Sequence, residues 1–246
     1  GLLDLSSLAK FEIAGTGAAA WLDRLTANRL PQKDGRIAGT PFLTKKGGIA
    51  AFAAITRLGP ERFYVTASAL AEQHLDDLLR RAAADRIDID NVTAARACLF
   101  LAGPKARDVL KAASESDVSD AALPAFSARD LTIGFAPVRI LRLSSVGGLG
   151  FEVHCEAPYL FAVYKALKEA GAAHGIVDIG MRAFDSLRIE RGLPRWGVDF
   201  GPVTRPKAIG FDRFVKPEKG DFVVDTRGRH AKGCRLGNQI TNVAQE

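Results

Sequence analysis

Residues 144–154 hold the side chains whose types and spacing are best suited to chemistry, a glycine-rich turn followed by a carboxylate. Three glycines within the four positions 147–150 deny this turn an ordinary helix or strand interior, since glycine weakens both through backbone entropy. The residues that follow alternate, so an expected strand carries Phe151 on one face and Glu152 and His154 on the other. Such a turn can deliver one carboxylate to a ligand, and it can equally be a plain hairpin turn before an exposed glutamate.

The histidines and cysteines show no spacing that is typical of a metal site or a catalytic triad. The histidines are at positions 74, 154, 174 and 230, and the cysteines are at positions 98, 155 and 234. No CxxC or HxxxH pair occurs, and an odd, sparse cysteine count argues against a disulfide framework and favours the reducing cytoplasm. We therefore predict no metal site, and we interpret His154 as a surface histidine that could touch a ligand beside Glu152.

Composition places the 246-residue chain among ordinary globular proteins, with 47% hydrophobic and 25% charged residues. No apolar run approaches the roughly 20 residues that span a bilayer, so no membrane segment is expected. The 34 Lys and Arg residues against 28 Asp and Glu give a net charge of +6, which favours anionic ligands through long-range attraction. Apart from the tail, the basic residues are scattered and lack the arginine–aromatic stripe of single-strand binders, which makes nucleic acid the least favoured partner.

Hydrophobic periodicity predicts groups of strands separated by helices, with hairpins between many of the strands. Strands are expected at residues 11–13, 36–43, 49–56, 62–67, 87–92, 97–101, 131–135 and 138–143. Helices are expected at residues 18–27, 69–84, 103–113, 158–171 and 179–191, the second with Leu70, Leu75, Leu78 and Leu79 inward. This grouping is typical of an α+β fold with mainly antiparallel sheets. The first residues have the character of a domain interior, so we expect native residues before Gly1.

Segments spread along nearly the whole chain match, in order, the motifs of one family. They are residues 3–12, 46–49, 101–107, 146–152, 185–190, 196–199 and 219–222. Together they resemble the folate-binding domain of the glycine-cleavage T-protein (aminomethyltransferase), most closely the C-terminal domain of dimethylglycine and sarcosine dehydrogenases. The resemblance implies two interleaved α+β subdomains over residues 1–224, with tetrahydrofolate bound in a central channel. The family's C-terminal barrel is expected to be absent, and residues 225–246 are expected to form a poorly packed basic tail.

The resemblance implies that a glutamate matching Glu152 holds the pteridine, because a carboxylate can accept two parallel hydrogen bonds from a ring N–H and its exocyclic amine. In the family, an aspartate near the reacting nitrogen orients the folate and stabilises the charge that develops there. Phe52 stands where this acid is expected, and no carboxylate follows until Glu61. Since phenylalanine can neither accept a proton nor balance a cation, the catalytic site is expected to be eroded, with its catalytic residues unassigned.

Other polar positions of the family's site are also changed. Its tyrosine seven residues before the glutamate is Ser145 here, and a tyrosine of an earlier strand is Gly39. Its arginine before the 185–190 motif is Phe184, although Arg182 is close enough in sequence to substitute. Ser145 and Arg182 therefore join Glu152 and Phe52 among the expected cofactor-binding positions.

Phe151 completes that set, because it is aromatic enough to stack on a pterin. Trp196 is a similar candidate, although core packing is the preferred interpretation of both rings. Arg188 is expected to tie the subdomains together by hydrogen bonds, with Asp185 as its i,i+3 partner on a helix.

Three hypotheses for the function remain. The first is a tetrahydrofolate-binding, aminomethyltransferase-like one-carbon transfer protein with an eroded catalytic site, acting on a small methylated amine with a dehydrogenase module or subunit. The second is a non-catalytic folate-binding or regulatory protein on the same fold, of the iron–sulfur maintenance type. That type carries a Lys-Gly-Cys motif, which residues 232–234 echo, but the matching position in order is 219–222, so we interpret the echo as coincidence. The third, a nucleic-acid-binding protein, rests on the charge alone.

Overall fold

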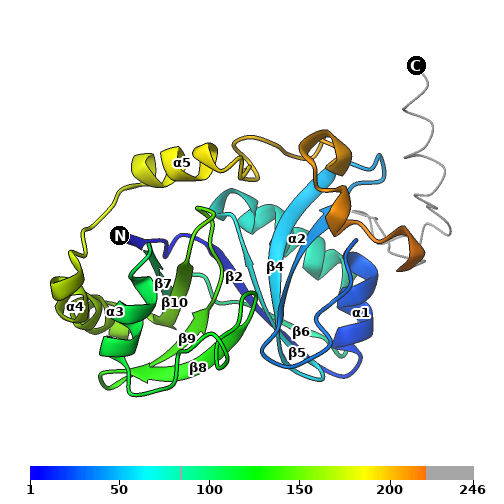
Figure 1. The fold of residues 1–246 in the computed structure, drawn as a ribbon. Helices are drawn as coiled ribbons and strands as arrows, with labels where there is room; N and C mark the ends of the chain where they lie inside the picture. Colours follow the sequence, from blue (N-terminus) through cyan, green and yellow to red (C-terminus); the bar gives the residue numbers. More distant parts are fainter. Residues whose placement is uncertain (84, 220–246) are drawn as a thin grey trace. The chain divides into compact units, whose positions relative to one another are not determined.

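The chain folds into two compact units, and each is assembled from two separate stretches of sequence (Figure 1). Unit 1 comprises Gly1–Leu8 and Val92–Pro194. Unit 2 comprises Ala9–Asn91 and, within the described part of the chain, residues 195–219. The two units therefore interleave along the sequence, since the chain leaves unit 1 after eight residues and returns to it at Val92.

The structure is a computed structural model that describes residues 1–83 and 85–219. Several expectations lie outside the described residues: the tail at 225–246, the domain boundary at 224, His230, Cys234 and all of the 219–222 motif except Lys219. Within residues 1–83 and 85–219, none of the helices combines the length and the apolar character that crossing a membrane requires.

Unit 1 is built around a five-stranded antiparallel sheet in the order β1-β7-β10-β9-β8. Its strands are β1 (Leu2–Asp4), β7 (Arg96–Ala102), β8 (Ala128–Ile133), β9 (Ala136–Leu141) and β10 (Gly150–Glu156). Its helices are α3 (Ala106–Ala113), α4 (Leu160–Gly171) and α5 (Met181–Glu190), with 3-10 turns at Ala157–Tyr159 and Ala172–His174. Strands β7 and β10 are interior strands, so hydrogen bonds hold each of them along both edges.

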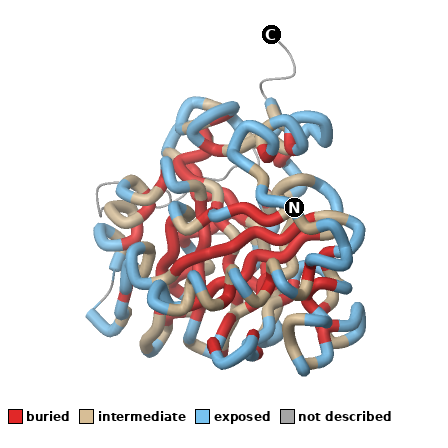
Figure 2. The backbone as a smooth tube through the Cα atoms, turned by 90° about the vertical axis from the view of Figure 1, so that its left-hand side faces the viewer, coloured by how far each residue is buried: buried red, intermediate tan, exposed pale blue. Residues whose placement is uncertain are grey.

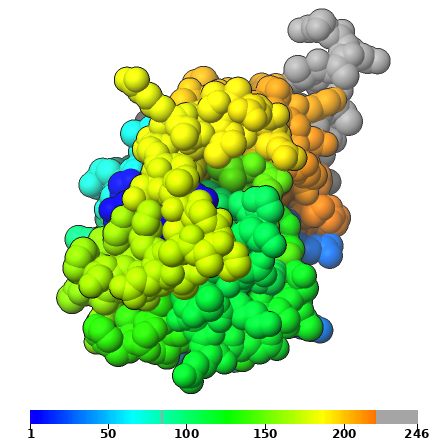
Figure 3. All heavy atoms as spheres, turned by 60° about the vertical axis from the view of Figure 1, so that its left-hand side comes forward, coloured from blue at the N-terminus to red at the C-terminus, as the bar shows by residue number. Residues whose placement is uncertain are grey.

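The two faces of this sheet carry different clusters of buried side chains. On one face, α3 and α4 cover a large apolar cluster that includes Val109 and Phe151. The other face carries a small cluster of buried residues, namely Leu3, Leu5, Cys98, Phe100, Ala102 and Phe184. The chain between α4 and α5 covers much of the N-terminal strand, because the N–H of Leu2 donates to Val177 and that of Ile179 donates to Leu2, each at 2.9 Å (Figure 3).

Unit 2 contains a second five-stranded antiparallel sheet, in the order β3-β4-β5-β2-β6. Its strands are β2 (Ala9–Ala14), β3 (Ile37–Leu43), β4 (Ile49–Gly59), β5 (Arg62–Ala67) and β6 (Asp88–Asn91). Its helices are α1 (Ala18–Leu25) and α2 (Glu72–Ala82), with 3-10 turns at Ala69–Ala71, Pro206–Ile209, Asp212–Phe214 and Pro217–Lys219. Figure 2 shows that buried residues follow the strands, and in this unit the core includes the fully buried rings of Phe11, Phe42 and Phe63.

The expected α+β fold with antiparallel sheets is confirmed, and the expected strands recur within a few residues of their positions. The prediction that Leu70 faces inward is wrong, because this side chain is 60% exposed. It lies in the 3-10 turn before α2, where the helical period that places Leu75 and Leu79 inside has not yet begun. The helix expected from Gly103 begins instead at Ala106, since Gly103 has a φ of 131° that no α-helix contains.

The hairpin between β3 and β4 requires glycine at both tip positions. Gly47 has a φ of 78°, and a Cβ on Gly48 would lie 1.9 Å from the carbonyl oxygen of Pro202. The next residue, Ile49, donates its N–H to the carbonyl of Thr204 at 2.9 Å. The Gly-Gly pair of the 46–49 motif therefore lets the later stretch of unit 2 lie directly against the hairpin.

Lys219, the described residue of the last motif, binds the chain that follows α1. Its Nζ donates to the carbonyl oxygens of Thr26 and Asn28, each at 2.7 Å, and to that of Asp23. It also forms an ion pair with Asp23 Oδ1 at 3.0 Å, and its side chain is 6% exposed. Burial lowers the pKa of this amine and the Asp23 carboxylate opposes that effect. One cation thus donates to three backbone carbonyls in and just after the last turn of α1, two of which also accept a hydrogen bond from Thr26.

Lys219→Met should lower the free energy of unfolding by about 2–4 kcal/mol, because the apolar side chain removes the buried charged donor that those carbonyls share and the ion pair with Asp23. Urea unfolding followed by circular dichroism measures the change. Lys207→Met, at an exposed position of the same stretch, is the matched control and should change stability little. Equal effects of the two substitutions would contradict this role of Lys219.

Candidate functional site

Strand β10 places Glu152 in the interior of the unit 1 sheet. The register pairs it with Phe100 on β7 and with Leu141 on β9. As expected, side chains alternate, so Phe151 enters the large cluster under α3 while Glu152 faces the small cluster. The alternation predicted a half-buried strand. This prediction is wrong, because both faces of β10 are covered and Glu152 is only 5% exposed.

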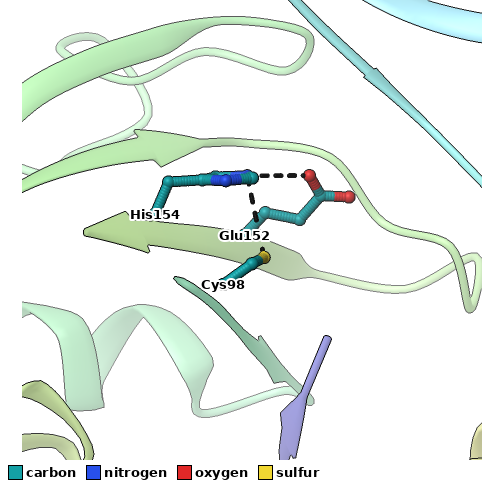
Figure 4. A group of neighbouring side chains, drawn as sticks. All are labelled: Cys98, Glu152 and His154. Carbon is teal, nitrogen blue, oxygen red and sulfur yellow. Dashed lines mark hydrogen bonds and ion pairs between the residues drawn. The ribbon is translucent and has the colours of Figure 1, made fainter. Parts of the chain in front are cut away.

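Glu152 belongs to a group of three neighbouring polar side chains, which we call the Cys-Glu-His cluster: Cys98, Glu152 and His154 (Figure 4). The Nε2 atom of His154 lies 3.1 Å from Oε2 of Glu152 and 3.7 Å from Sγ of Cys98. Cys98 and His154 are each 0% exposed. The imidazole therefore contacts both the carboxylate and the thiol in a site nearly closed to solvent.

The interpretation of His154 as a surface residue is wrong, and the cause is strand pairing. Cys98 and His154 are direct partners in the antiparallel ladder of β7 and β10, so their side chains project from the same face. They are separated by 56 positions in sequence, and no local spacing rule can detect such a pair. The signal available in the sequence was weak: a cysteine and a histidine, each within an apolar strand.

The glycine stretch before β10 lets the chain pass close to other side chains. Gly147 has a φ of 75°, and a Cβ on it would lie 2.8 Å from the Arg191 side chain. A Cβ on Gly150 would lie 3.0 Å from the ring of Phe100 and 3.1 Å from Cβ of Ser144. The Ser144 hydroxyl is buried and has no hydrogen-bond partner among the described residues, whereas Ser145 is half-buried. This turn therefore places the Ser144 hydroxyl beside Gly150, and Gly150 is two positions before Glu152.

Helix α5 buries Phe184 and exposes Arg182. The Phe184 ring packs edge-on against Phe100 at 5.8 Å between centroids, within the small cluster. The side chains of residues two apart on a helix point in different directions, so the Arg182 side chain does not point the same way as that of Phe184. One turn later, Arg188 is buried, and its Nε donates to Asp185 Oδ1 at 2.7 Å, which confirms this i,i+3 pair. Arg188 also donates to the carbonyl of Leu193 at 3.1 Å, and both of these bonds lie within unit 1.

Phe151 and Trp196 are core residues, as the preferred interpretation held. Phe151 is 0% exposed in the large cluster, with the guanidinium of Arg107 5.2 Å from its ring centre. Trp196 is buried in unit 2 and donates its Nε1–H to the carbonyl of Ile49 at 2.9 Å. Since Phe151 lies on the sheet face opposite Glu152, a ligand held by Glu152 has no access to that ring.

In unit 2, Phe52 is half-buried in an aromatic group with Phe211 and Phe214, at centroid distances of 4.9 and 5.3 Å. The ring also lies over Gly39, where an added Cβ would be 3.1 Å from Phe52 Cζ and 3.6 Å from Phe214. The phenylalanine at 52 and the glycine at 39 are therefore complementary: the larger side chain fills the space that the smaller residue leaves.

Glu61, the next carboxylate after Phe52, has a different position and a structural role. Its Oε2 accepts a hydrogen bond from the backbone N–H of Ala19 at 2.8 Å, in the first turn of α1. That turn contains no acidic residue of its own, so Glu61 supplies the negative charge that a helix N-terminus favours. The contacts of Glu61 thus give it a structural role in stabilising α1.

Comparison with known proteins identifies the family. Residues 1–219 match a family model described as the GCVT N-terminal domain, and the chain belongs to this family. It is similar to mitochondrial dimethylglycine dehydrogenase of Mus musculus, at 32% identity over 228 residues, covering 91% of this chain and 26% of that protein. It is also similar to the mitochondrial pyruvate dehydrogenase phosphatase regulatory subunit of Mus musculus, at 31% identity over 228 residues, covering 90% of this chain and 26% of that protein.

The fold comparison agrees with the sequence comparison. The chain is similar to the crystal structure of glycine cleavage system aminomethyltransferase T from Bartonella henselae, with a TM-score of 0.79 and 25% identity, covering 98% of this chain and 63% of that one. The resemblance to the glycine-cleavage T-protein family inferred from the ordered motifs is thus confirmed. The chain spans about a quarter of the length of the two mouse relatives it matches.

Because Phe52 and Gly39 share one space, Gly39→Tyr should lower the free energy of unfolding by about 1–3 kcal/mol. The double variant Gly39→Tyr/Phe52→Ala should lose less than the sum of the two single variants, by at least about 0.5 kcal/mol. Urea unfolding of the four proteins of this cycle measures the coupling. Gly201→Tyr is the matched control, because a Cβ there meets nothing within 4 Å. Strict additivity of Gly39→Tyr and Phe52→Ala would contradict the shared space.

Proposed function

We propose that this chain is a tetrahydrofolate-binding domain of one-carbon metabolism in which Glu152 holds the pterin and the catalytic acid has been lost. One observation carries the proposal: Glu152 places a carboxylate on a buried sheet face whose other members are mainly apolar, with one hydrogen-bond partner, His154, among the described residues. Burying a carboxylate is costly unless hydrogen-bond donors compensate. A ligand that supplies two N–H donors would provide that compensation.

The geometry of Glu152 suits a ligand with paired donors. His154 lies against Oε2, and the other carboxylate oxygen points away from the imidazole (Figure 4). Since a carboxylate offers about four lone-pair sites, one contact with His154 leaves both oxygens able to accept more hydrogen bonds. The pterin edge of a folate carries a ring N–H beside an exocyclic amine, and this pair matches the two oxygens of one carboxylate. The half-buried Ser145 and the buried hydroxyl of Ser144 are further polar groups near the start of β10.

Loss of the catalytic acid is supported by the packing around Phe52. Its ring joins Phe211 and Phe214 and lies over Gly39, so the change is accommodated by several neighbours. An aromatic ring there carries no negative charge to neutralise the positive charge that develops when a one-carbon unit moves between nitrogens. We infer a folate-binding domain with little transfer activity of its own.

The substrate and partner follow from the relatives as proposals. Since dimethylglycine dehydrogenase of Mus musculus is similar to this chain over about a quarter of its length, we propose that the chain works with a dehydrogenase module or subunit that oxidises a small methylated amine. The second candidate is a non-catalytic regulatory protein on the same fold. The aromatic packing of Phe52 against Phe211 favours this second candidate, and so does the similarity to a phosphatase regulatory subunit.

Tetrahydrofolate should bind to the full chain in calorimetric titration under anaerobic conditions. Glu152→Ala should weaken binding by at least about tenfold, because loss of a charged acceptor removes about 1.4 kcal/mol or more. Glu156→Ala, at the exposed end of the same strand, is the matched control and should bind like the parent. Failure of the parent to bind, or equal binding by Glu152→Ala, would overturn the folate proposal.

Methylenetetrahydrofolate formation should stay at the uncatalysed rate when the chain is supplied with tetrahydrofolate, sarcosine or dimethylglycine, and a separate amine dehydrogenase. The physical reason is that Phe52 supplies neither a base nor a negative charge. The assay follows the folate product by absorbance, and a catalytically competent T-protein serves as the positive control. A clear acceleration by this chain would show that another residue replaces the acid.

A further inference from the structure

The Cys-Glu-His cluster has a composition that a pterin-binding carboxylate does not need. A thiol, an imidazole and a carboxylate are the three side-chain types that bind zinc, and here their potential ligand atoms all lie within 4.8 Å of one another. We propose that Cys98, Glu152 and His154 bind one Zn²⁺ ion through Sγ, a carboxylate oxygen and Nε2. Three protein ligands leave a fourth position of a tetrahedral site for water or a small ligand.

The distances fit a tetrahedral ion with little movement. Zinc bonds of about 2.0–2.3 Å to oxygen, nitrogen and sulfur place neighbouring ligand atoms about 3.3–3.6 Å apart. In the structure, Nε2 of His154 lies 3.1 Å from Oε2 of Glu152 and 3.7 Å from Sγ of Cys98. Shifts of a few tenths of an ångström therefore bring these two ligand pairs to the spacing of a zinc site. Figure 4 shows the imidazole directed at the carboxylate and lying over the thiol.

The charges also balance. When Zn²⁺ binds, the S–H bond of Cys98 breaks, its proton goes to solvent, and a zinc–sulfur bond forms. The neutral imidazole of His154 binds through Nε2 with its proton on Nδ1, and the Glu152 carboxylate binds without losing a proton. One thiolate and one carboxylate then neutralise the ion, so the buried site carries no net charge. Neutrality matters because an uncompensated charge in so dry a place is strongly unfavourable.

The scaffold holds the three ligands before any ion arrives. Cys98 and His154 are direct partners across β7 and β10, and Glu152 is two residues before His154 on the same face. Both strands are interior strands of the sheet, so the ligand positions are fixed by hydrogen bonds on two sides. Glu152, with 5% exposure against 0% for the other two, is the ligand that solvent and an entering ion meet first.

Cys155 provides an internal comparison. It follows His154 on β10 but points to the opposite face, into the large apolar cluster. Among residues 1–83 and 85–219, only Cys98 is part of a group of three potential metal ligands that includes a histidine and a carboxylate.

The zinc site uses Glu152, which the proposed function also uses, but it does not depend on folate binding. The decisive experiment is done on the full chain, freed of metal by a chelator and of folate by dialysis. Titration with ZnCl₂ should show one ion per chain with a dissociation constant below about 1 µM. Titration with Co²⁺ should give a thiolate-to-cobalt charge-transfer band. Folate binding is then measured separately, so either proposal can fail while the other stands.

Matched variants assign the ligands. Cys98→Ser and His154→Gln should each weaken Zn²⁺ binding by more than about 100-fold, beyond what loss of an outer-shell contact costs, and Cys98→Ser should remove the charge-transfer band. Cys155→Ser, Cys234→Ser and His174→Gln should bind like the parent. A parent dissociation constant above about 1 µM, or a Cys98→Ser protein that keeps the band, would overturn the proposal. If Cys98→Ser does not fold, X-ray absorption at the zinc edge of the parent decides, because a first shell without sulfur also overturns it.

Discussion

The antiparallel pairing of β10 with β7 and β9 is the constraint on which the candidate site depends. Because β10 is an interior strand, its backbone polar groups are satisfied on both sides, and its side chains must enter one or other covered face of the sheet. The register then decides which groups meet: Glu152 lies opposite Phe100, and His154 lies opposite Cys98. A slip of one residue would send the carboxylate into the large apolar cluster and Phe151 to the other side. Gly150, the first residue of β10, serves this register, because a Cβ on it would lie only 3.0 Å from the Phe100 ring.

The differences from the family's polar site are structurally consistent with one another. In unit 2, Phe52, Phe211 and Phe214 form an aromatic group over Gly39, and Glu61 is engaged at the start of α1. In unit 1, Phe184 packs on Phe100 and adds to the small cluster around Cys98. Phe52 and Phe184 therefore each have aromatic packing partners. Apolar groups of fitting shape can replace polar ones at little cost to the fold, so the eroded site that we propose is compatible with the T-protein fold.

The small cluster of unit 1 combines two environments that are seldom found together. Its apolar side chains exclude water, and beside them the Cys-Glu-His cluster holds hydrogen-bonding groups close together in that dry setting. Electrostatic interactions are stronger where water is excluded, which is why we propose both a ligand with paired donors and a divalent ion for this site. The same carboxylate serves both possibilities, and this makes Glu152 the residue on which the chemistry of unit 1 depends.

Local patterns determined most of the secondary structure and the family. Apolar periodicity marked strands such as β5 and the core face of α2, the Gly-Gly pair marked the β3–β4 hairpin, and the ordered motifs identified a T-protein-like α+β fold with Glu152 as a candidate ligand residue. These features are readable because each depends on neighbours within a few positions. Leu70 was misplaced where a 3-10 turn interrupts that local period. Tertiary structure alone decided that His154 is buried, that Cys98 lies beside it, that Phe52 fills the space over Gly39, and that Lys219 binds the end of α1. These contacts join residues far apart in sequence, and their geometry is set by strand register and close packing, which no local pattern encodes.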